Sequence, residues 1–412
     1  MASWLKAWLL IIILSPLVAF AQPRIEKGKL DLRNWNFQRQ GTVPLDGEWR
    51  FYWEQFLMPQ QPTGESADYF TFPGLWNGHY SGASNLNGQG FATYTATILV
   101  PHDVRMLSME LPDFYTCYQL WINGTEVARN GSVGASRKES VPQWLPKTIA
   151  FPSSDTLNII MHVANFHHVR GGSNDHIYLG LPEQLYQKRE AAVITNIILF
   201  SGLGLIGCFF VVLFFFFRKD KAALYFAAIC LTWALRAVFT NLYLFVNWFP
   251  SIDWELAVKV EYLTLYLTMM WSLLYVAKLF PGDVNTILKY VLIAVNSIFI
   301  LFTIASPAVT YTNLLPAYQL VAWVILGYVG FVVARAIIYD RAGAWFSAIS
   351  IILGVLMFSY DMLTYQGFWN FSPLLFNVGY LTIFFLNAMA FAYQISRQVN
   401  PKPKVEFGFT LK

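Results

Sequence analysis

The stretch NIILFSGLGLIGCFFVVLFFFFRKD, residues 196–220, indicates the class of this protein, because a long apolar run ends abruptly in charged residues. An α-helix needs about 20 apolar residues to cross a bilayer core of roughly 30 Å, and the run containing this stretch covers residues 191–217. Six more apolar blocks follow, at 222–246, 257–279, 286–305, 315–338, 343–365 and 372–396. We therefore expect an all-α bundle of seven transmembrane helices over residues 188–396, with the lipid bilayer as its first partner.

The composition of the whole chain agrees with a membrane protein. Of its 412 residues, 56% are hydrophobic and 13% are charged, about half the charged fraction of a typical soluble domain. The net charge of +4 is small, and no basic run with interleaved aromatic residues lies outside the apolar blocks. We therefore expect no nucleic acid among its partners.

The first 21 residues resemble an export signal. Lys6 precedes the apolar run LLIIILSPLV, and Ala19-Phe20-Ala21 forms an A-x-A cleavage site. Such a run is short for a membrane span, so residues 1–21 are predicted to be a signal peptide. The alternative is an uncleaved N-terminal anchor. Both interpretations export the chain from Gln22 onward.

Residues 22–187 have the pattern of an all-β domain. Short alternating runs are separated by turn residues, namely EWRFYW, FATYTATILV, YQLWING, TLNIIMHVANF and HIYLGL. Asn123-Gly124 predicts a tight hairpin, because both residues tolerate positive φ. The number and spacing of the strands favour a jelly roll or β-sandwich.

Three cysteines limit the covalent chemistry. Only Cys117 lies in the exported part, which therefore has no internal disulfide, and no zinc-binding spacing of Cys or His occurs. We expect all three thiols to be buried as small apolar groups. Pairing between two chains, in a homodimer, is the alternative for Cys117.

The basic residues predict the orientation. With the β domain outside, the inner loops and tail carry ten lysines and arginines near the membrane, and the outer side carries three: Lys188, Arg189 and Lys259. The inner set is Arg218, Lys219, Lys221, Lys278, Lys289, Arg335, Arg341, Arg397, Lys402 and Lys404. This asymmetry follows the positive-inside rule. Residues 397–412 are thus expected to be a short cytoplasmic tail.

The chain resembles the bacterial seven-transmembrane receptors with diverse intracellular signalling modules (7TMR-DISM). In the membrane half the resemblance rests on LYF at 224–226, LR at 235–236, EYL at 261–263 and LFP at 279–281. In the exported half LDGEWRFYW (45–53), FPGLW (72–76), GFATYTATI (90–98), LWINGTEVARNGSVG (120–134) and NFHHVRGG (165–172) are similar to a galactose-binding-like jelly roll.

The resemblance implies a receptor of the bacterial inner membrane whose periplasmic domain detects a carbohydrate-like or other small molecule. Members usually continue into a histidine kinase or nucleotide cyclase, whereas here only SRQVNPKPKVEFGFTLK follows the last helix. All six histidines precede the helices and no nucleotide-binding signature occurs. We therefore expect no enzyme and no cofactor, and a separate cytoplasmic kinase or cyclase as partner, unless the sequence is part of a longer receptor. The alternative function is an accessory envelope protein that docks another protein.

Candidate ligand-binding residues lie in the exported domain. Trp76, Trp121 and Trp144 are suited to stacking on a sugar, although packing in the core explains each of them equally. The stretch NFHHVRGGSNDHIYLG at 165–180 adds Asn165, His167, His168 and Arg170. This stretch is open to four interpretations: a turn fixed by side-chain hydrogen bonds, a ligand or helix contact, a metal site including Asp175 and His176, or pH sensing by His167 and His168 near pH ~6.5.

Three ionisable residues fall inside the apolar blocks, where charges are costly. Counted along their helices, Arg236, Glu261 and Asp361 all lie in the outer third of a core of roughly 30 Å. We therefore expect Arg236 to pair with Glu261, Asp361 or both. The cluster is either a static staple or a switch that re-pairs when the outer domain binds its ligand.

Overall fold

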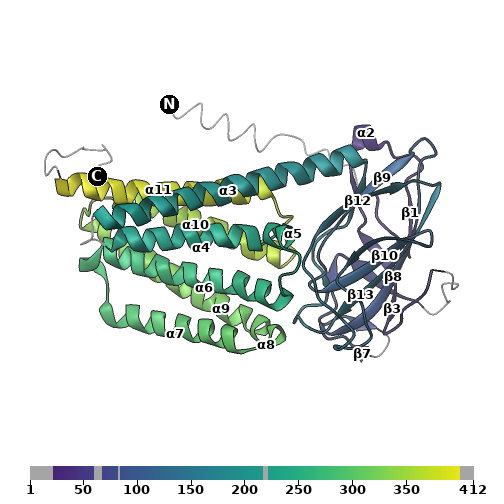
Figure 1. Cartoon of the computed structure of the whole chain (residues 1–412), viewed down its shortest axis with the longest axis horizontal. Helices are drawn as coiled ribbons and strands as arrows, with labels where there is room; N and C mark the ends of the chain where they lie inside the picture. Colours follow the sequence, from purple (N-terminus) through teal and green to yellow (C-terminus); the bar gives the residue numbers. More distant parts are fainter. Residues whose placement is uncertain (1–21, 60–66, 82–83, 217–220, 400–412) are drawn as a thin grey trace.

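The computed structural model describes residues 22–59, 67–81, 84–216 and 221–399. The predicted signal peptide at 1–21 and most of the predicted tail lie outside these residues. A β domain sits at one end of a long helical bundle (Figure 1). The predicted fold class, an all-β domain followed by seven apolar helices, is confirmed.

The β domain is a sandwich of two sheets. The larger sheet has the order β11-β10-β13-β8-β3-β4, with β1 also paired to β8. Its strands are β1 Lys29–Asp31, β3 Gly47–Trp53, β4 Asp68–Phe72, β8 Gly90–Leu99, β10 Cys117–Ile122, β11 Thr125–Asn130 and β13 Thr156–Asn165. The smaller sheet has the order β12-β9-β15-β2, from β2 Val43–Pro44, β9 Met106–Leu111, β12 Lys147–Pro152 and β15 Tyr178–Gly180.

Short elements complete the domain. They are α2 Phe37–Gln40, β5 Gly74–Leu75, β6 Tyr80–Ser81, β7 Ser84–Asn85 and β14 Gly172–Ser173. The predicted hairpin joins β10 to β11, with φ of 50° at Asn123 and 85° at Gly124. Positive φ at both positions matches the twist of the paired strands. Buried aromatic side chains such as Trp49, Phe51 and Tyr94 fill the space between the sheets.

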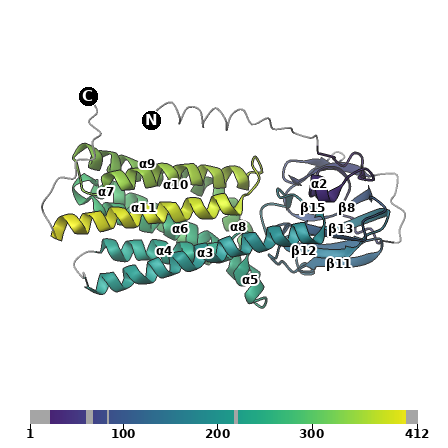
Figure 2. The ribbon, with the colours of Figure 1, turned by 90° about the horizontal axis from the view of Figure 1, so that it is seen from above.

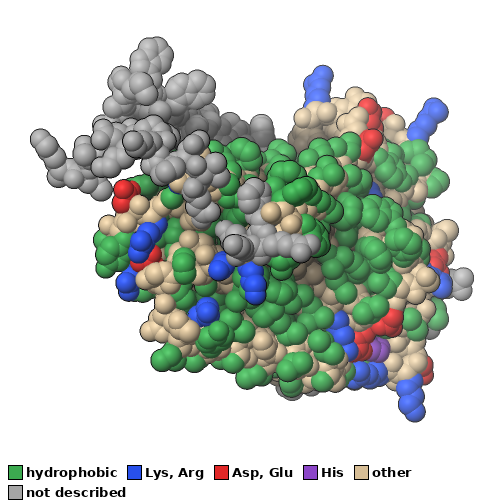
Figure 3. Space-filling model, turned by 60° about the vertical axis from the view of Figure 1, so that its left-hand side comes forward, with side chains coloured by type: hydrophobic (Ala, Val, Ile, Leu, Met, Phe, Trp, Pro, Cys, Tyr) green, Lys and Arg blue, Asp and Glu red, His purple; other side chains and the backbone are tan. Residues whose placement is uncertain are grey.

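Seven helices are long and apolar enough to cross a membrane. They are α3 Pro182–Phe216, α4 Ala222–Phe239, α6 Trp254–Leu279, α7 Thr286–Ala305, α9 Leu315–Ile338, α10 Ala344–Tyr365 and α11 Pro373–Val399. The connections contain the short helices α5 Leu244–Trp248, η1 Pro281–Asp283 and α8 Ala308–Asn313. Large apolar side chains cover the outside of the bundle (Figure 3), including Leu205 and Ile338, which are 73% and 76% exposed. Such a surface suits lipid, and the chain is a multi-pass membrane protein.

Two helix boundaries differ from the sequence prediction. Helix α3 begins at Pro182, two residues after β15, and its 35 residues extend about 52 Å from the sandwich into the bundle (Figure 2). The expected domain boundary at 187 to 188 therefore lies inside a helix. The predicted block 222–246 is divided because Asn241 and Tyr243 adopt positive φ, which ends α4 before α5 begins.

Candidate functional site

The loop after β13 is shaped by Asn165, which is fully buried. Its side-chain amide donates to the carbonyl groups of Gly88, His168 and Arg170, and its oxygen accepts from the backbone amides of His167 and His168. Four of these contacts lie within the turn itself, and the fifth ties the turn to the segment that contains Gly88. Asn165 therefore fixes the loop, and its neighbours are the residues free to reach outward.

Arg170 extends from this loop to the outer end of α10. Its Nη1 donates to the carbonyl of Tyr365 at 2.8 Å, and its Nη2 donates to Oε1 of Gln366 at 3.1 Å. The guanidinium also lies 3.7 Å from the centre of the Tyr365 ring. Asn174 donates to the same Tyr365 carbonyl at 3.1 Å. The stretch singled out in the sequence thus docks the β domain on the helices.

His176 forms a second bridge between the domains. Its Nδ1 lies 2.7 Å from Oδ1 of Asp46 in the β domain, and its Nε2 lies 2.8 Å from Oδ1 of Asn370 between α10 and α11. The hydrogen bond to Asp46 raises the pKa of His176 above its ordinary value of 6.5. The imidazolium form donates from both nitrogens, so acid favours this bridge.

The two adjacent histidines do not fit the expected role in pH sensing. His168 is buried and stacks on Tyr115 with ring centroids 4.9 Å apart, and burial lowers its pKa to about 3. Burial also lowers the pKa of His167, whose ring faces Trp254. The His168 imidazole is therefore neutral at ordinary pH, and the lowered pKa of His167 also favours its neutral form. Among the described residues, no group of three or more His, Cys, Asp or Glu side chains is arranged to hold a metal ion.

The three candidate tryptophans lie in different places. Trp76 is fully buried in the sandwich core, and its Nε1 donates to the Tyr94 hydroxyl. Trp121 is half-buried on the larger sheet, edge-on to His162. Only Trp144 lies at the junction, where it packs against Tyr243 and Trp254. Packing therefore accounts for Trp76, whereas Trp144 also lines the cavity at the junction.

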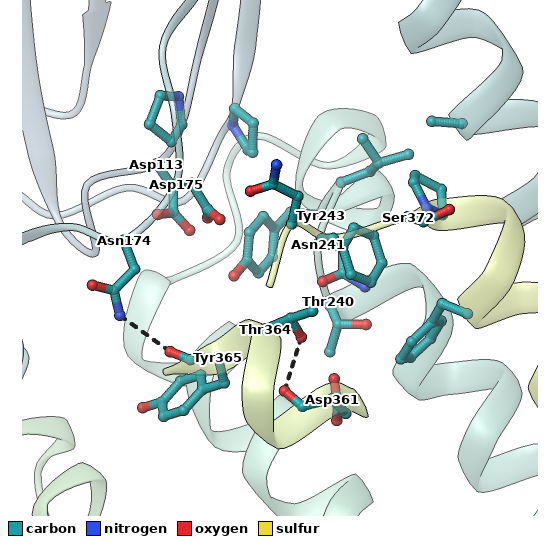
Figure 4. A pocket seen from close by; sticks show the side chains of 18 of the residues that line it. Asp113, Asn174, Asp175, Thr240, Asn241, Tyr243, Asp361, Thr364, Tyr365 and Ser372 are labelled. Carbon is teal, nitrogen blue, oxygen red and sulfur yellow. Dashed lines mark hydrogen bonds between the residues drawn. The ribbon is translucent and has the colours of Figure 1, made fainter. Parts of the chain in front are cut away.

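A cavity of about 600 Å³ lies between the β domain and the outer ends of the helices. Its wall comes from both domains and contains five carboxylates: Glu110, Asp113, Asp175, Glu261 and Asp361. Figure 4 shows Asp113 and Asp175 beside each other, with Asp361 on the far side of the space. The volume is typical of a site for a small ligand.

Two of the carboxylates, Asp113 and Asp175, come from loops of the sandwich. Burial, reinforced by the charge of Asp175, raises the pKa of Asp113 to about 6, and the hydroxyl of Tyr243 opposes this shift by hydrogen bonding to Asp113. Burial also raises the pKa of Asp175. Asp175 lines the cavity, and its surface is exposed to solvent.

Arg236, Glu261 and Asp361 all line the membrane side of this cavity. Arg236 is only 9% exposed, and its Nη1 donates to the backbone carbonyl of Glu261 at 2.8 Å. The ion pairs within 4.0 Å among the described residues do not include this arginine. The three residues therefore cluster as expected, but the carboxylate pairing does not form. Nε of Arg236 and Oε2 of Glu261 are both buried without a hydrogen-bond partner.

Sequence reasoning did not assign Asp113, Tyr115, Tyr243 or Tyr365 to a site. Asp113 precedes a tight turn in which Phe114 and Tyr115 both have positive φ, at 55° and 62°. The stretch LPDFY at 111–115 is the only local signal of this turn. Nothing in the sequence indicates that it faces the helices.

The opposite end of the bundle has its own polar cluster. The carboxylate of Asp283, in η1, is buried and lies 3.2 Å from Nε of Arg341 and 3.9 Å from Nε of Arg335. Gln394 on α11 donates to the carbonyls of Leu279 and Ala342. These contacts tie α6, α9 and α11 together on the side away from the β domain (Figure 1).

Residues 194–397 match the sequence family described as 7TM diverse intracellular signalling. A β-glucuronidase from an uncultured Clostridium species is similar in structure, with a TM-score of 0.27 and 13% identity over 34% of this chain and 28% of that chain. A β-glucuronidase of Ruminococcus gnavus gives 0.26 and 11% over 34% and 28%, and a β-galacturonidase of Eisenbergiella tayi gives 0.24 and 13% over 34% and 24%. The chain thus spans less than a third of these neighbours, and so distant a likeness carries no information about activity. The search of curated proteins gave no match.

Proposed function

Since the helical half of the chain, residues 194–397, belongs to the family of 7TM domains of diverse intracellular signalling, we propose that the protein is a bacterial receptor that binds a small extracytoplasmic solute in the junction cavity. The helices then pass the change inward to a separate cytoplasmic protein, for which a kinase or nucleotide cyclase is the expected class. The family consists of transmembrane sensors with seven apolar helices.

One observation carries this proposal: the cavity is walled by both domains. A ligand changes an equilibrium only when it binds one arrangement better than another. A solute that touches Asp113 and Asp361 together binds best when the sandwich is docked on the helices. The bridges made by Arg170 and His176 surround the same junction. Ligand binding is thereby linked to the position of the whole β domain.

A periplasmic location of the β domain and a cytoplasmic location of Lys221 form part of the proposal. Support comes from the basic residues, because those at the far end of the bundle outnumber those beside the sandwich. Cysteine labelling in intact cells with a membrane-impermeant reagent tests the sidedness, in a variant whose native cysteines are alanine. Exposed Ser154→Cys is expected to react from outside and Lys221→Cys only after lysis. The reverse result overturns the orientation.

A reversible lock across the junction tests the transmission. A Cβ built on Gly367 lies 3.4 Å from the Cβ of Asn174, close to the roughly 3.5–4.5 Å that a disulfide spans. The φ of Gly367 is 80°, so cysteine there costs about 1–2 kcal/mol. The reduced form of the Asn174→Cys/Gly367→Cys variant supplies the matched reference for this strain.

Hydrogen exchange of the full chain in lipid nanodiscs is the readout. Oxidation is expected to slow exchange in residues 280–284 and 339–343 by at least about threefold, and reduction should restore it. The two single-cysteine variants should show no effect of oxidation. Unchanged exchange at these inner segments, despite a formed disulfide, overturns the proposed transmission.

A further inference from the structure

The charges on the wall of the junction cavity do not balance. Asp113 and Asp175 line the cavity from the β domain, and Glu261 and Asp361 line it from the helices. Arg236 is the basic residue on the helix side. At the rim, Glu110 is already paired with Lys188 at 2.7 Å. Lys147 and Arg189, also in the wall, donate to the backbone carbonyls of Arg129 and Pro146 and keep their positive charges. The five carboxylates of the wall therefore exceed its four lysines and arginines by one.

The histidines of the wall do not correct this imbalance. His168 is neutral at ordinary pH, because burial lowers its pKa to about 3. The charge of His176 is matched by Asp46, with which it shares a hydrogen bond of 2.7 Å. An excess of enclosed negative charge is costly unless protons or a bound cation neutralise it.

Two buried atoms on the membrane side of the wall have no partner. Oε2 of Glu261 accepts no hydrogen bond, and Nε of Arg236, a residue only 9% exposed, donates none. Buried polar atoms are usually satisfied, so each such exception needs an explanation. A ligand with hydrogen-bond donors explains the free acceptor on Glu261.

The arrangement of the carboxylates argues against a metal ion. They come from four separate segments: the loop after β9, the loop before β15, α6 and α10. Within the described parts of the chain, no three ligating side chains converge as a metal requires. An elongated cation reaches groups that a compact ion does not.

We propose that the junction cavity binds a small organic cation with an amino group at each end, one held between Asp113 and Asp175 and the other beside Glu261 and Asp361. The inference rests on the proposed receptor function and names the class of its ligand. The volume of about 600 Å³ is ample for a molecule of this kind. Tyr115, Tyr243 and Tyr365 add aromatic walls, which favour ammonium groups.

Such a ligand also has a mechanical consequence. Its two ends neutralise carboxylates of the sandwich and of the helices at once. The bound molecule therefore stabilises the docked arrangement and leaves any undocked arrangement unaffected.

Isothermal titration of the full chain in lipid nanodiscs tests the proposal with three probes of equal chain length. Putrescine carries two ammonium groups, 1,4-butanediol is neutral, and succinate carries two negative charges. Putrescine alone is expected to bind. Asp175→Asn and Glu261→Gln should each weaken its affinity at least about tenfold, or 1.4 kcal/mol, whereas the matched exposed control Asp103→Asn should not.

Each alternative result decides the matter. Equal binding of the diol, or putrescine binding that is insensitive to both amide variants, overturns the cation site. If Asp175→Asn fails to fold, Asp361→Asn makes the same test. Absence of putrescine binding, while the disulfide lock still changes the inner face, refutes this inference alone. Putrescine binding without an effect of the lock refutes the signalling proposal and leaves the site intact.

Discussion

Replacing Arg170 by alanine should release the β domain from the helices. Each hydrogen bond from the charged guanidinium, to Tyr365 and to Gln366, contributes about 1.5–3 kcal/mol. Its position 3.7 Å from the Tyr365 ring contributes a further ~0.5–2 kcal/mol. Because these contacts share one side chain they are not additive, and we expect docking to weaken by about 3–4 kcal/mol. That loss corresponds to a roughly 10²- to 10³-fold larger undocked fraction.

Hydrogen exchange of the full chain in nanodiscs measures this change. Peptides that cover residues 168–176 and 362–370 should exchange faster by the same factor, because local opening exposes both sides of the junction. Arg170→Lys keeps the charge but loses the fork of donors, so an intermediate effect of about 1.5–2 kcal/mol is expected.

Arg129→Ala is the matched control, since Arg129 is exposed and pairs with Glu126 inside the β domain. The reasoning is refuted if Arg170→Ala accelerates exchange at the junction no more than this control does. An equal effect of Arg170→Lys and Arg170→Ala would show that the fork geometry is irrelevant.

Three further changes test other parts of the structure. Because Asp46 raises the pKa of His176, its bridge to Asn370 should be fully formed below pH 6.5 and lost as the pH rises through the raised value. Exchange protection of residues 366–372 should fall accordingly as the pH rises above 6.5 in the native chain and stay flat in His176→Gln. Parallel curves for the two proteins would contradict this. Asn165→Ala should lower the free energy of unfolding of the sandwich by about 3 kcal/mol, measured by thermal denaturation, and a loss below about 1 kcal/mol would be too small for five lost contacts. Asp283→Asn should loosen the inner ends of the helices by about 1–3 kcal/mol, seen as faster exchange in residues 335–344 with the outer ends unaffected.

The sequence predicted the helices well because apolar length alone determines a membrane span. Five of the seven predicted blocks agree with the observed helices to within about three residues. The first turns of α3 were missed because Pro182–Lys188 contains too many polar residues for a hydropathy signal. The early end of α4 was missed because left-handed residues at Asn241 and Tyr243 interrupt a run that stays apolar.

Sequence signals located part of the site. The polar stretch at 165–180 contains His168, Asp175 and His176, which line the cavity, and the energetic cost of burying a charge in the membrane is a second signal. Charged residues inside apolar helices are such a signal, and Arg236, Glu261 and Asp361 were located by it. The sequence gives only the depth of each residue in the membrane, however, and depth does not determine which side-chain atoms are in contact. The sequence therefore indicated an ion pair where the structure has a hydrogen bond to the Glu261 carbonyl. Asp113 joins Glu261 only through the docking of two domains, which no local pattern encodes.

Docking at the junction is opposed by the same groups that form the cavity. Arg170 and His176 hold the sandwich against the helices, while Asp113 and Asp175 bring negative charge toward Glu261 and Asp361. Two opposed contributions leave the undocked arrangement only a few kcal/mol above the docked one, a gap that a ligand with different affinities for the two arrangements can change. A cation that removes the repulsion then moves the balance, and α3, as one unbroken helix from the sandwich into the membrane, carries the displacement inward. On this reasoning, neutral amides at the carboxylate positions should dock the domain without any ligand, so the variants that lose binding should resemble the liganded receptor at its inner face.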